Sequence, residues 1–229
     1  MKLLINNKLW AIAIILLSGI FYIGSCRHDN ELLVSNGPKI ERGTLKLTLN
    51  DSKVSFDKSH SNVGWSTPYL GNAALLTGRF NNFGFTTFNF DESNAAGINF
   101  EAWVWLNTVN TGEPGRDGNC LLGTFGTSTG LSTDVTNIAK IKSKSVELST
   151  TDRGYIVKAD FTFHGVTKEI TGKLMFDGKA ETGTGATLKN VYGFSFDFQI
   201  LAKTDYLIVS NNIADKIEVK SNAIFRAIP

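Results

Sequence analysis

Alternation of apolar and polar residues with a period of two constrains this fold more than any other feature of the sequence. Between residues 155 and 164, Tyr155, Val157, Ala159, Phe161 and Phe163 take one face, and Lys158, Asp160, Thr162 and His164 take the other. Successive side chains of a β-strand point to opposite faces of its sheet, so this stretch predicts a strand with one buried face.

The same alternation recurs along most of the chain. It is found at residues 45–49, 54–57, 63–67, 98–106, 139–145, 170–176, 192–200 and 217–225. Residues 79–91 carry five phenylalanines, and the parity from Thr86 onward places Thr86, Phe88 and Phe90 on one face. Turn residues separate these stretches, and no long helical period competes with them. The sequence therefore predicts an all-β fold of about eight or nine antiparallel strands, arranged as two packed sheets or one barrel.

The predicted strand at residues 98–110 has apolar residues on both faces. Phe100, Ala102 and Val104 share one face, and Trp103 and Trp105 lie on the other. A strand with one face in water would not show this pattern, so either the second face is covered or one face lines a cavity. Small residues interleaved with the aromatic ones favour a cavity: Ala102, Ala159, Gly172, Ser221 and Ala223. A solidly packed aromatic barrel is the alternative.

The first 26 residues predict export and lipid attachment. Lys2 and Lys8 flank the start of an apolar segment, Leu9 to Ile23, that ends in Ile23-Gly24-Ser25-Cys26. This ending resembles the lipobox of bacterial lipoproteins, which implies cleavage before Cys26, lipidation of its thiol and a bacterial envelope location on the periplasmic side or outer membrane. We expect a signal peptide at 1–25, a polar tether at 26–42 and one domain at 43–229. An uncleaved membrane anchor is the alternative.

Charge and motifs exclude several classes of function. The formal net charge is +2 and the basic residues are scattered, so nucleic acid is not an expected partner. Neither a zinc-protease motif nor a phosphate loop occurs, and we expect no enzyme, cofactor or metal site. His60 and His164 lie in turns, where we expect them to fix strand ends by hydrogen bonds. Cys120 is interpreted as a small apolar residue at a turn, with a reactive thiol left open.

Three blocks of sequence resemble the YceI-like family. The first is His60-Ser61, following an acidic residue, with Gly78-Arg79-Phe80. The second runs from Thr111-Gly112 through Arg116-Asp117 and Leu121-Leu122 to Phe125, but Asn119 and Cys120 stand where the family has a histidine. The third and sharpest is the turn His164-Gly165-Val166-Thr167-Lys168.

This resemblance implies a single antiparallel, extended lipocalin-like β-barrel with short helical connections that binds an isoprenoid-type or quinone-like lipid. The inward faces of the predicted strands supply the candidate cavity residues: Trp65, Phe80, Phe88, Phe100, Val104, Tyr155, Phe161, Phe163, Leu174, Phe176, Phe194, Phe196, Phe198 and Phe225. Arg79, Arg116 and Asp117 are candidates for the cavity mouth, or else they make turn hydrogen bonds and ion pairs.

The expected partners are a hydrophobic lipid and, through Cys26, a membrane; a homodimer is left open. One alternative function is a structural or protein-interaction module that uses Trp103 or Trp105 on the outer face. The other is a lipid-modifying enzyme, which would need a polar cluster inside the cavity.

Overall fold

A computed structural model describes residues 42–127, 130 and 133–229. The predicted signal peptide, the lipidation site Cys26 and all of the predicted tether except Arg42 lie outside these residues. Residues 42–229 form one compact unit. At its start, the guanidinium of Arg42 lies 4.5 Å above the ring of Tyr155 and donates to the Gly154 carbonyl at 3.1 Å. These contacts hold the beginning of the domain against the turn at residues 149–154.

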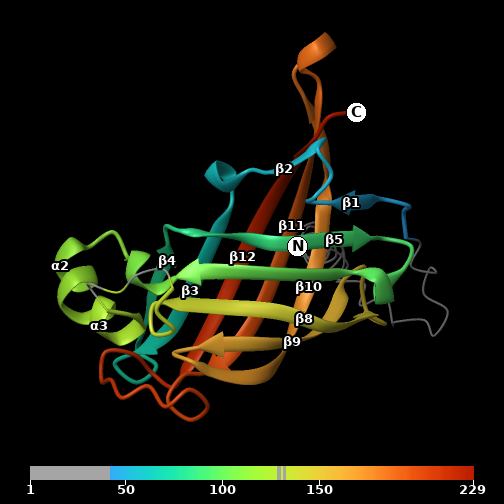
Figure 1. The fold of residues 1–229 in the computed structure, drawn as a ribbon. Helices are drawn as coiled ribbons and strands as arrows, with labels where there is room; N and C mark the ends of the chain where they lie inside the picture. The colour runs from blue at the N-terminus through green and yellow to red at the C-terminus, as the bar shows by residue number, and fades with distance from the viewer. Residues whose placement is uncertain (1–41, 128–129, 131–132) are drawn as a thin grey trace, which may run out of the picture. The chain divides into compact units, whose positions relative to one another are not determined.

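The described residues form one curled antiparallel sheet, as Figure 1 shows. Its twelve strands are β1 Lys46–Thr48, β2 Val54–Phe56, β3 Asn62–Tyr69, β4 Ala74–Phe80, β5 Phe83–Asp91, β6 Asn99–Trp105, β7 Val109–Asn110, β8 Ile138–Leu148, β9 Tyr155–Phe163, β10 Val166–Thr182, β11 Lys189–Leu201 and β12 Lys216–Ala227. Their order is β1-β5-β6-β8-β9-β10-β11-β12-β3-β4-β7, and β2 also pairs with β12. The predicted all-β, lipocalin-like architecture is confirmed, with a half-open barrel and more strands than the expected eight.

Short helices join the strands. The 3₁₀ turns are η1 Lys58–His60, η2 Ala95–Gly97, η3 Leu106–Thr108 and η5 Gly185–Thr187. A continuous helical segment consists of α2 Pro114–Arg116, the π-helical η4 Asp117–Leu121 and α3 Leu122–Phe125. It lies at one end of the curled sheet (Figure 1). Leu121 and Phe125 are buried, so the segment covers that end of the core.

β9 shows most directly how the sequence produces the sheet. The five residues of its predicted inner face, Tyr155, Val157, Ala159, Phe161 and Phe163, are all buried, and Ile156 on the other face is exposed. The strand then turns through His164 and Gly165, whose φ angles are 50° and 75°, and Phe163 pairs with Val166. Two consecutive residues with positive φ form a tight hairpin turn whose twist matches that of paired strands.

Two predicted strands differ from the observed ones. Residues 79–91 divide at Asn81-Asn82 into the end of β4 and the whole of β5. A bulge in β5 lies between Phe85 and Thr87, so Thr86 is exposed instead of sharing a face with Phe88. The strand predicted at 98–110 ends at Trp105, where η3 begins. Its last two residues form β7, which pairs with β4.

The hairpin of β10 and β11 is longer than predicted. Asp177-Gly178 was expected to end the strand, but β10 continues through a bulge at this point to Thr182. Gly178 has a φ of 144°, a conformation that favours glycine. Residues 178–182 pair with 189–193, and this extension projects from the sheet in Figure 1.

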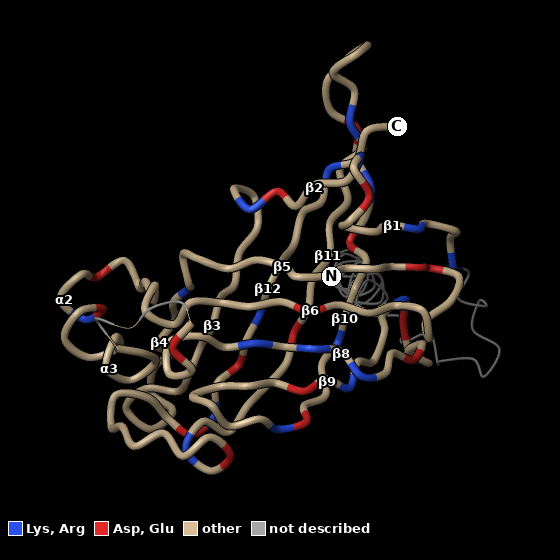
Figure 2. The backbone as a smooth tube through the Cα atoms, in the orientation of Figure 1, with Lys and Arg blue, Asp and Glu red and all other residues tan. Residues whose placement is uncertain are grey.

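Two lysines of β8 form ion pairs with acidic residues of other strands. Figure 2 shows the lysines of β8 beside acidic residues of adjacent strands. Lys144 Nζ lies 2.6 Å from Glu169 on β10 and 3.6 Å from Asp160 on β9, and Lys142 lies 3.8 Å from Glu101 on β6. Exposed pairs of this kind contribute little stability, but they offset the positive charge of these two lysines.

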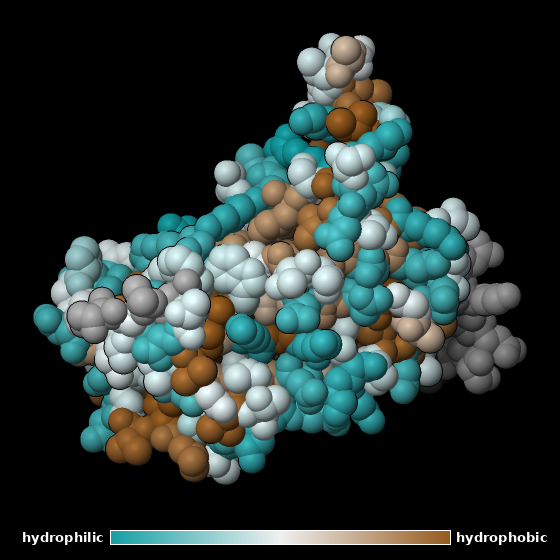
Figure 3. Space-filling view, in the orientation of Figure 1, coloured by the Kyte–Doolittle hydropathy of each residue, from teal (hydrophilic) through white to brown (hydrophobic). Residues whose placement is uncertain are grey.

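The loop at residues 202–215 closes the same end of the core as the helical segment. Tyr206, Ile208 and Ile213 are buried, whereas Leu207 and Val209 are exposed. In Figure 3, apolar side chains gather at this end of the domain. No helix in the described part of the chain is long and apolar enough to cross a membrane.

Candidate functional site

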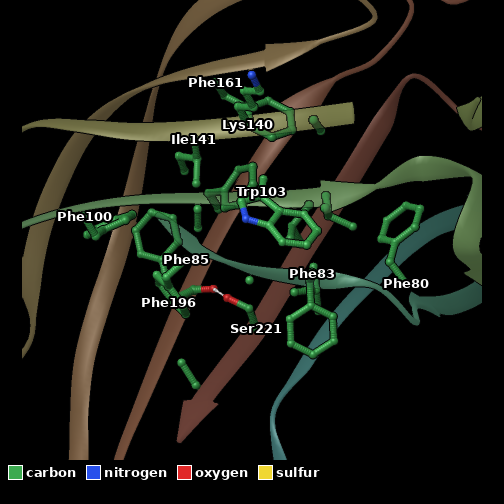
Figure 4. A pocket seen from close by; sticks show the side chains of 18 of the residues that line it. Phe80, Phe83, Phe85, Phe100, Trp103, Lys140, Ile141, Phe161, Phe196 and Ser221 are labelled. Carbon is green, nitrogen blue, oxygen red and sulfur yellow. Dashed lines mark hydrogen bonds between the residues drawn. The ribbon is translucent and has the colours of Figure 1, made fainter. Parts of the chain in front are cut away.

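The concave side of the sheet encloses an apolar cavity of about 120 Å³, measured as the space open to the centre of a water molecule. Side chains from β2 to β6 and from β8 to β12 line it, together with Phe125 of α3. Figure 4 shows Phe83 and Phe85 on β5 with Phe196 and Ser221 beyond them. The volume accommodates several water-sized groups, which suits a slender chain better than a bulky ring system.

Charge is nearly absent from the lining. Among the described residues that form it, only Lys140 is ionisable, and its side chain is exposed at the rim. The hydroxyl of Ser221 donates to the Phe196 carbonyl at 2.8 Å, so its one hydrogen-bond donor is already used. Such a cavity attracts apolar groups and disfavours buried ions.

Eleven of the fourteen predicted cavity residues line this space: Trp65, Phe80, Phe88, Phe100, Val104, Phe161, Phe163, Leu174, Phe194, Phe196 and Phe198. Their contact with a ligand stays a prediction. Tyr155, Phe176 and Phe225 do not line it, in contrast to the sequence-based expectation. These three belong to an aromatic cluster that fills one end of the barrel.

We call this cluster the aromatic floor: Phe88, Phe90, Tyr155, Phe176, Phe194 and Phe225. Phe88 stacks on Phe225 with ring centroids 4.3 Å apart, and Phe176 lies 5.3 Å from Phe194. Only Phe88 and Phe194 of the six also face the cavity. The rings therefore close this end by packing against one another.

The predicted mouth residues lie elsewhere. Arg79 is exposed on β4 and Arg116 is exposed on α2, and neither lines the cavity. The carboxylate of Asp117 accepts hydrogen bonds from the Thr111 backbone at 3.0 Å and from the Thr111 hydroxyl at 2.7 Å. Asp117 therefore fixes the start of the helical segment by hydrogen bonds. A turn hydrogen bond was the alternative role expected for it from the sequence.

β5, whose side chains line the cavity, has an unpaired edge. β1 pairs only with residues 89–91 of β5, so residues 83–87 have β6 on one side and no described strand on the other. Phe56 bridges this edge from β2, with its ring 5.1 Å from Phe85 and 6.2 Å from Phe83. Lys58 in η1 donates to the Asn82 side chain at 2.6 Å and lies 5.7 Å from the Phe83 ring centroid. We call this edge the slit.

A polar network anchors the segment that crosses the slit. Asp57 accepts from Arg226 Nε at 2.6 Å and from His60 Nδ1 at 2.8 Å. Burial raises the pKa of Asp57, but the hydrogen bonds from Arg226 and His60 outweigh this effect and hold it below its usual range. The ionised carboxylate thereby ties the start of η1 to the end of β12.

The other end of the cavity is closed by Phe125. Its ring centroid lies 4.9 Å from that of Trp65 and 5.6 Å from that of Phe80. His164 Nε2 donates to the Phe125 carbonyl at 2.6 Å. Burial lowers the pKa of His164, and this hydrogen bond only partly offsets the effect. We call this region the helical end; behind it, Tyr206 packs 5.7 Å from both Phe161 and Phe163.

Two buried side-chain donors near the helical end lack a hydrogen-bond partner. They are Trp65 Nε1, whose side chain lines the cavity, and the Tyr206 hydroxyl, whose side chain does not. Burial without a partner raises the pKa of Tyr206 strongly. Buried donors of this kind are uncommon in folded proteins.

Sequence reasoning missed several lining residues. Phe56, Phe83, Phe85 and Trp103 all line the cavity, and Phe125 had been noted only as part of a family-like block. Phe83 and Phe85 were not predicted to line the cavity, because the bulge in β5 changes which residues of that stretch share a face. Trp103 lies on the same face as Trp105, as predicted, and its indole covers Gly84, where an added Cβ would come within 2.9 Å of the ring. The missing side chain at Gly84 lets the indole reach the cavity wall.

Candidate catalytic groups are dispersed. His60 and His164 bond to Asp57 and Phe125, respectively, and no cluster of three or more potential metal ligands occurs among the described residues. Cys120 is a half-buried free thiol in η4. Residues 126–130, Gly-Thr-Ser-Thr-Gly, have the letters of a hydrolase G-x-S-x-G motif, although that motif requires a strand before it and a helix after it. Here α3 precedes the segment and β8 follows, and Ser128 lies outside the described residues.

Known proteins share this architecture. A protein from Vibrio parahaemolyticus named UPF0312 is 26% identical over 164 residues, which cover 69% of this chain and 82% of that protein. The YCEI protein of Campylobacter jejuni is 20% identical, with a TM-score of 0.53 over 76% of this chain and 96% of that one. BcnA of Burkholderia cenocepacia is 15% identical, with a TM-score of 0.56 over 74% of this chain and 99% of that one.

The two structural likenesses describe the fold alone, because their sequence identities are low. The family model is more direct: a model of the YceI-like domain matches residues 55–225, from β2 to β12. The match includes the strands that line the cavity, the helical segment and the His164 turn. This chain therefore belongs to the YceI-like domain family.

Proposed function

We propose that the protein binds a hydrophobic amphiphile, of isoprenoid type, in the cavity of its barrel as a carrier or store. The observation that carries the proposal is an apolar cavity on the concave side of the sheet, with one exposed ionisable side chain, Lys140, in its described lining. Each Å² of apolar surface that a ligand removes from water contributes about 25 cal/mol. A slender hydrocarbon chain gains this contribution along its whole length.

The proposed isoprenoid character is supported by the family and by the shape of the site. A narrow cavity with many aromatic walls fits a long, methyl-branched chain, and aromatic side chains supply contact at little entropic cost. The proposed location is a bacterial membrane facing the envelope, where a lipid on Cys26 would hold the protein. Its support is the sequence Ile23-Gly24-Ser25-Cys26 after an apolar segment. Acyl chains contribute about 0.8 kcal/mol per buried methylene to such anchoring.

Filling the cavity tests the function. Ala223 lies on β12, lines the cavity and is half-buried, so Ala223→Trp places an indole in the space proposed for the ligand. We expect lipid extracted from the purified wild-type protein and measured by mass spectrometry to fall at least about tenfold in this variant. Ala180→Trp is the matched control, because Ala180 is exposed on β10 and should leave the extracted lipid unchanged.

The alternatives give different results in the same experiment. A solidly packed interaction module yields no stoichiometric lipid from the wild-type protein, and Ala223→Trp then changes stability alone. Wild-type protein that carries no lipid, and that takes up none from detergent-free vesicles, contradicts the proposed function.

A further inference from the structure

Trp65 holds a hydrogen-bond donor in the cavity wall that nothing in the described structure uses. The side chain is 3% exposed and lines the cavity, and Nε1 has no partner. A buried N–H without an acceptor costs stability, because its hydrogen bond to water is lost on folding. A phenylalanine would fill much of the same apolar space without this cost.

The indole is held in a fixed position. Trp65 lies opposite Gly78 in the β3–β4 pair, and a Cβ at Gly78 would come within 2.8 Å of Cε2, the carbon bonded to Nε1. On its other side, Phe125 packs at 4.9 Å between ring centroids. The absence of a side chain at Gly78 and the contact with Phe125 therefore fix the indole in a pocket of its own.

The two ends of the cavity differ in polarity. The aromatic floor presents the rings of Phe88 and Phe194, which carry no hydrogen-bonding group. The helical end presents the Trp65 N–H. Lys140 is exposed at the rim, so no described side chain inside the cavity could neutralise a buried phosphate or carboxylate. An uncharged hydrogen-bond acceptor can pair with the Trp65 N–H and needs no neutralising charge inside the cavity.

We infer that Trp65 Nε1 donates a hydrogen bond to an uncharged oxygen acceptor, a carbonyl oxygen, at the head of the bound amphiphile. The head lies at the helical end beside Phe125, and the chain runs toward the aromatic floor. This inference rests on the proposed function and adds the polarity and orientation of the ligand. It replaces the head group expected from the sequence, which Arg79, Arg116 and Asp117 were to hold, with an uncharged head bound by Trp65.

We call the position of this acceptor beside Trp65 Nε1 the subsite. A matched pair of ligands and a matched pair of proteins test it. Decane and 2-decanone have the same chain length, and each is measured by displacement of N-phenyl-1-naphthylamine from the full chain. Trp65→Phe keeps an aromatic ring and removes the N–H. We expect the preference for 2-decanone over decane to fall about tenfold in Trp65→Phe, because a buried donor and its acceptor are no longer paired. Decane affinity reports whether the variant cavity is intact.

A second measurement needs only the wild-type protein, in case Trp65→Phe does not fold. In 5-decanone the carbonyl lies in the middle of the chain, away from a donor at the end of the cavity. We expect 2-decanone to bind several-fold more tightly than 5-decanone. Equal affinities for the two ketones overturn the inference.

The outcomes separate this inference from the function on which it rests. If decane and 2-decanone both bind and Trp65→Phe leaves their ratio unchanged, the subsite is wrong, the Phe125 ring satisfies the N–H, and the lipid-binding function stands. If neither ligand binds to the wild-type protein, both the subsite and the proposed function are wrong.

Discussion

His164 occupies a backbone conformation that few histidines adopt. Its φ is 50°, in the left-handed region that asparagine and glycine fill more readily. The ring explains this choice, because Nε2 reaches the Phe125 carbonyl at the end of α3 at 2.6 Å. The residue thus connects the β9–β10 turn to the part of α3 whose ring closes the cavity. The sequence predicted its role at a strand end, but the distant partner is visible only in the fold.

The lowered pKa of His164 makes stability depend on pH. The folded state favours the neutral ring, so its contribution is fully present above about 6.5, the reference pKa for histidine, and is lost as pH falls toward the lower folded value. His164→Asn keeps a residue that tolerates positive φ but cannot titrate. We expect it to cost about 1 kcal/mol at pH 7.5, and the difference from wild type to shrink as pH falls to 5.5.

Urea denaturation at several pH values measures this difference. His60→Asn is the control, because His60 is exposed and bonds to Asp57 instead of the helical end. A His164→Asn variant with the same pH dependence as wild type contradicts the assignment.

At the level of single strands, β10 shows that a small residue on an inner face does not always leave space. The sequence suggested that Gly172 contributes to the cavity. In the structure the Phe196 ring occupies that position, and an added Cβ would lie 2.4 Å from Cζ of the ring. By contrast, Ala102, Ser221 and Ala223 do line the cavity. Pattern identifies the small residues, but the neighbouring strand decides whether a ring or a void lies above them.

Gly172→Ala therefore changes the cavity through Phe196. The ring must move, while the Asp197 carbonyl 3.0 Å from the new Cβ limits how far the backbone can adjust. We expect a loss of about 1–3 kcal/mol in the free energy of unfolding and several-fold weaker binding of decane. Gly193→Ala on β11 is the control, because its Cβ would meet only ordinary contacts at 3.6 Å. Equal effects of both variants in denaturation and binding would refute this account.

Regular strands could be predicted and irregular ones could not. β9 follows its alternation without exception, and its inner face agrees with the sequence. The bulges at Thr86 and Asp177 each add a residue to one strand, which reverses the parity beyond them. For this reason Phe83 and Phe85 were missed as lining residues. Tyr155, Phe176 and Phe225 were wrongly expected to line the cavity for another reason, since alternation gives the face of a residue but not its position along the barrel axis.

At the scale of the whole domain, the slit makes ligand exchange depend on a few contacts. Lys58 bonds to Asn82 across it, and Phe56 packs on Phe83 and Phe85. These contacts connect the strand before the slit to β5 without a ladder of backbone hydrogen bonds. The sequence could not reveal the slit, because it predicts strands but not which two fail to pair.

Weakening the contacts across the slit should change the rates of ligand association and dissociation more than the affinity for the ligand. Lys58→Met removes the hydrogen bond to Asn82 but keeps an apolar stem over Phe83. We expect association and dissociation of N-phenyl-1-naphthylamine, followed by stopped-flow fluorescence, both to quicken several-fold while the dissociation constant changes by less than about twofold. Lys53→Met, an exposed change just before β2, should leave both rates unaltered. If Lys58→Met instead leaves exchange unchanged, ligands do not enter at this edge.

The place of β12 in the sheet also determines when this protein can fold during its synthesis. β12 is the last strand of the chain, and it joins β11 to β3 and β2. Without it the sheet falls into two unconnected runs, each with an apolar face open to water. The sheet therefore cannot close until β12 has left the ribosome. Until then the apolar faces of the earlier strands stay accessible to the translocation machinery and to chaperones.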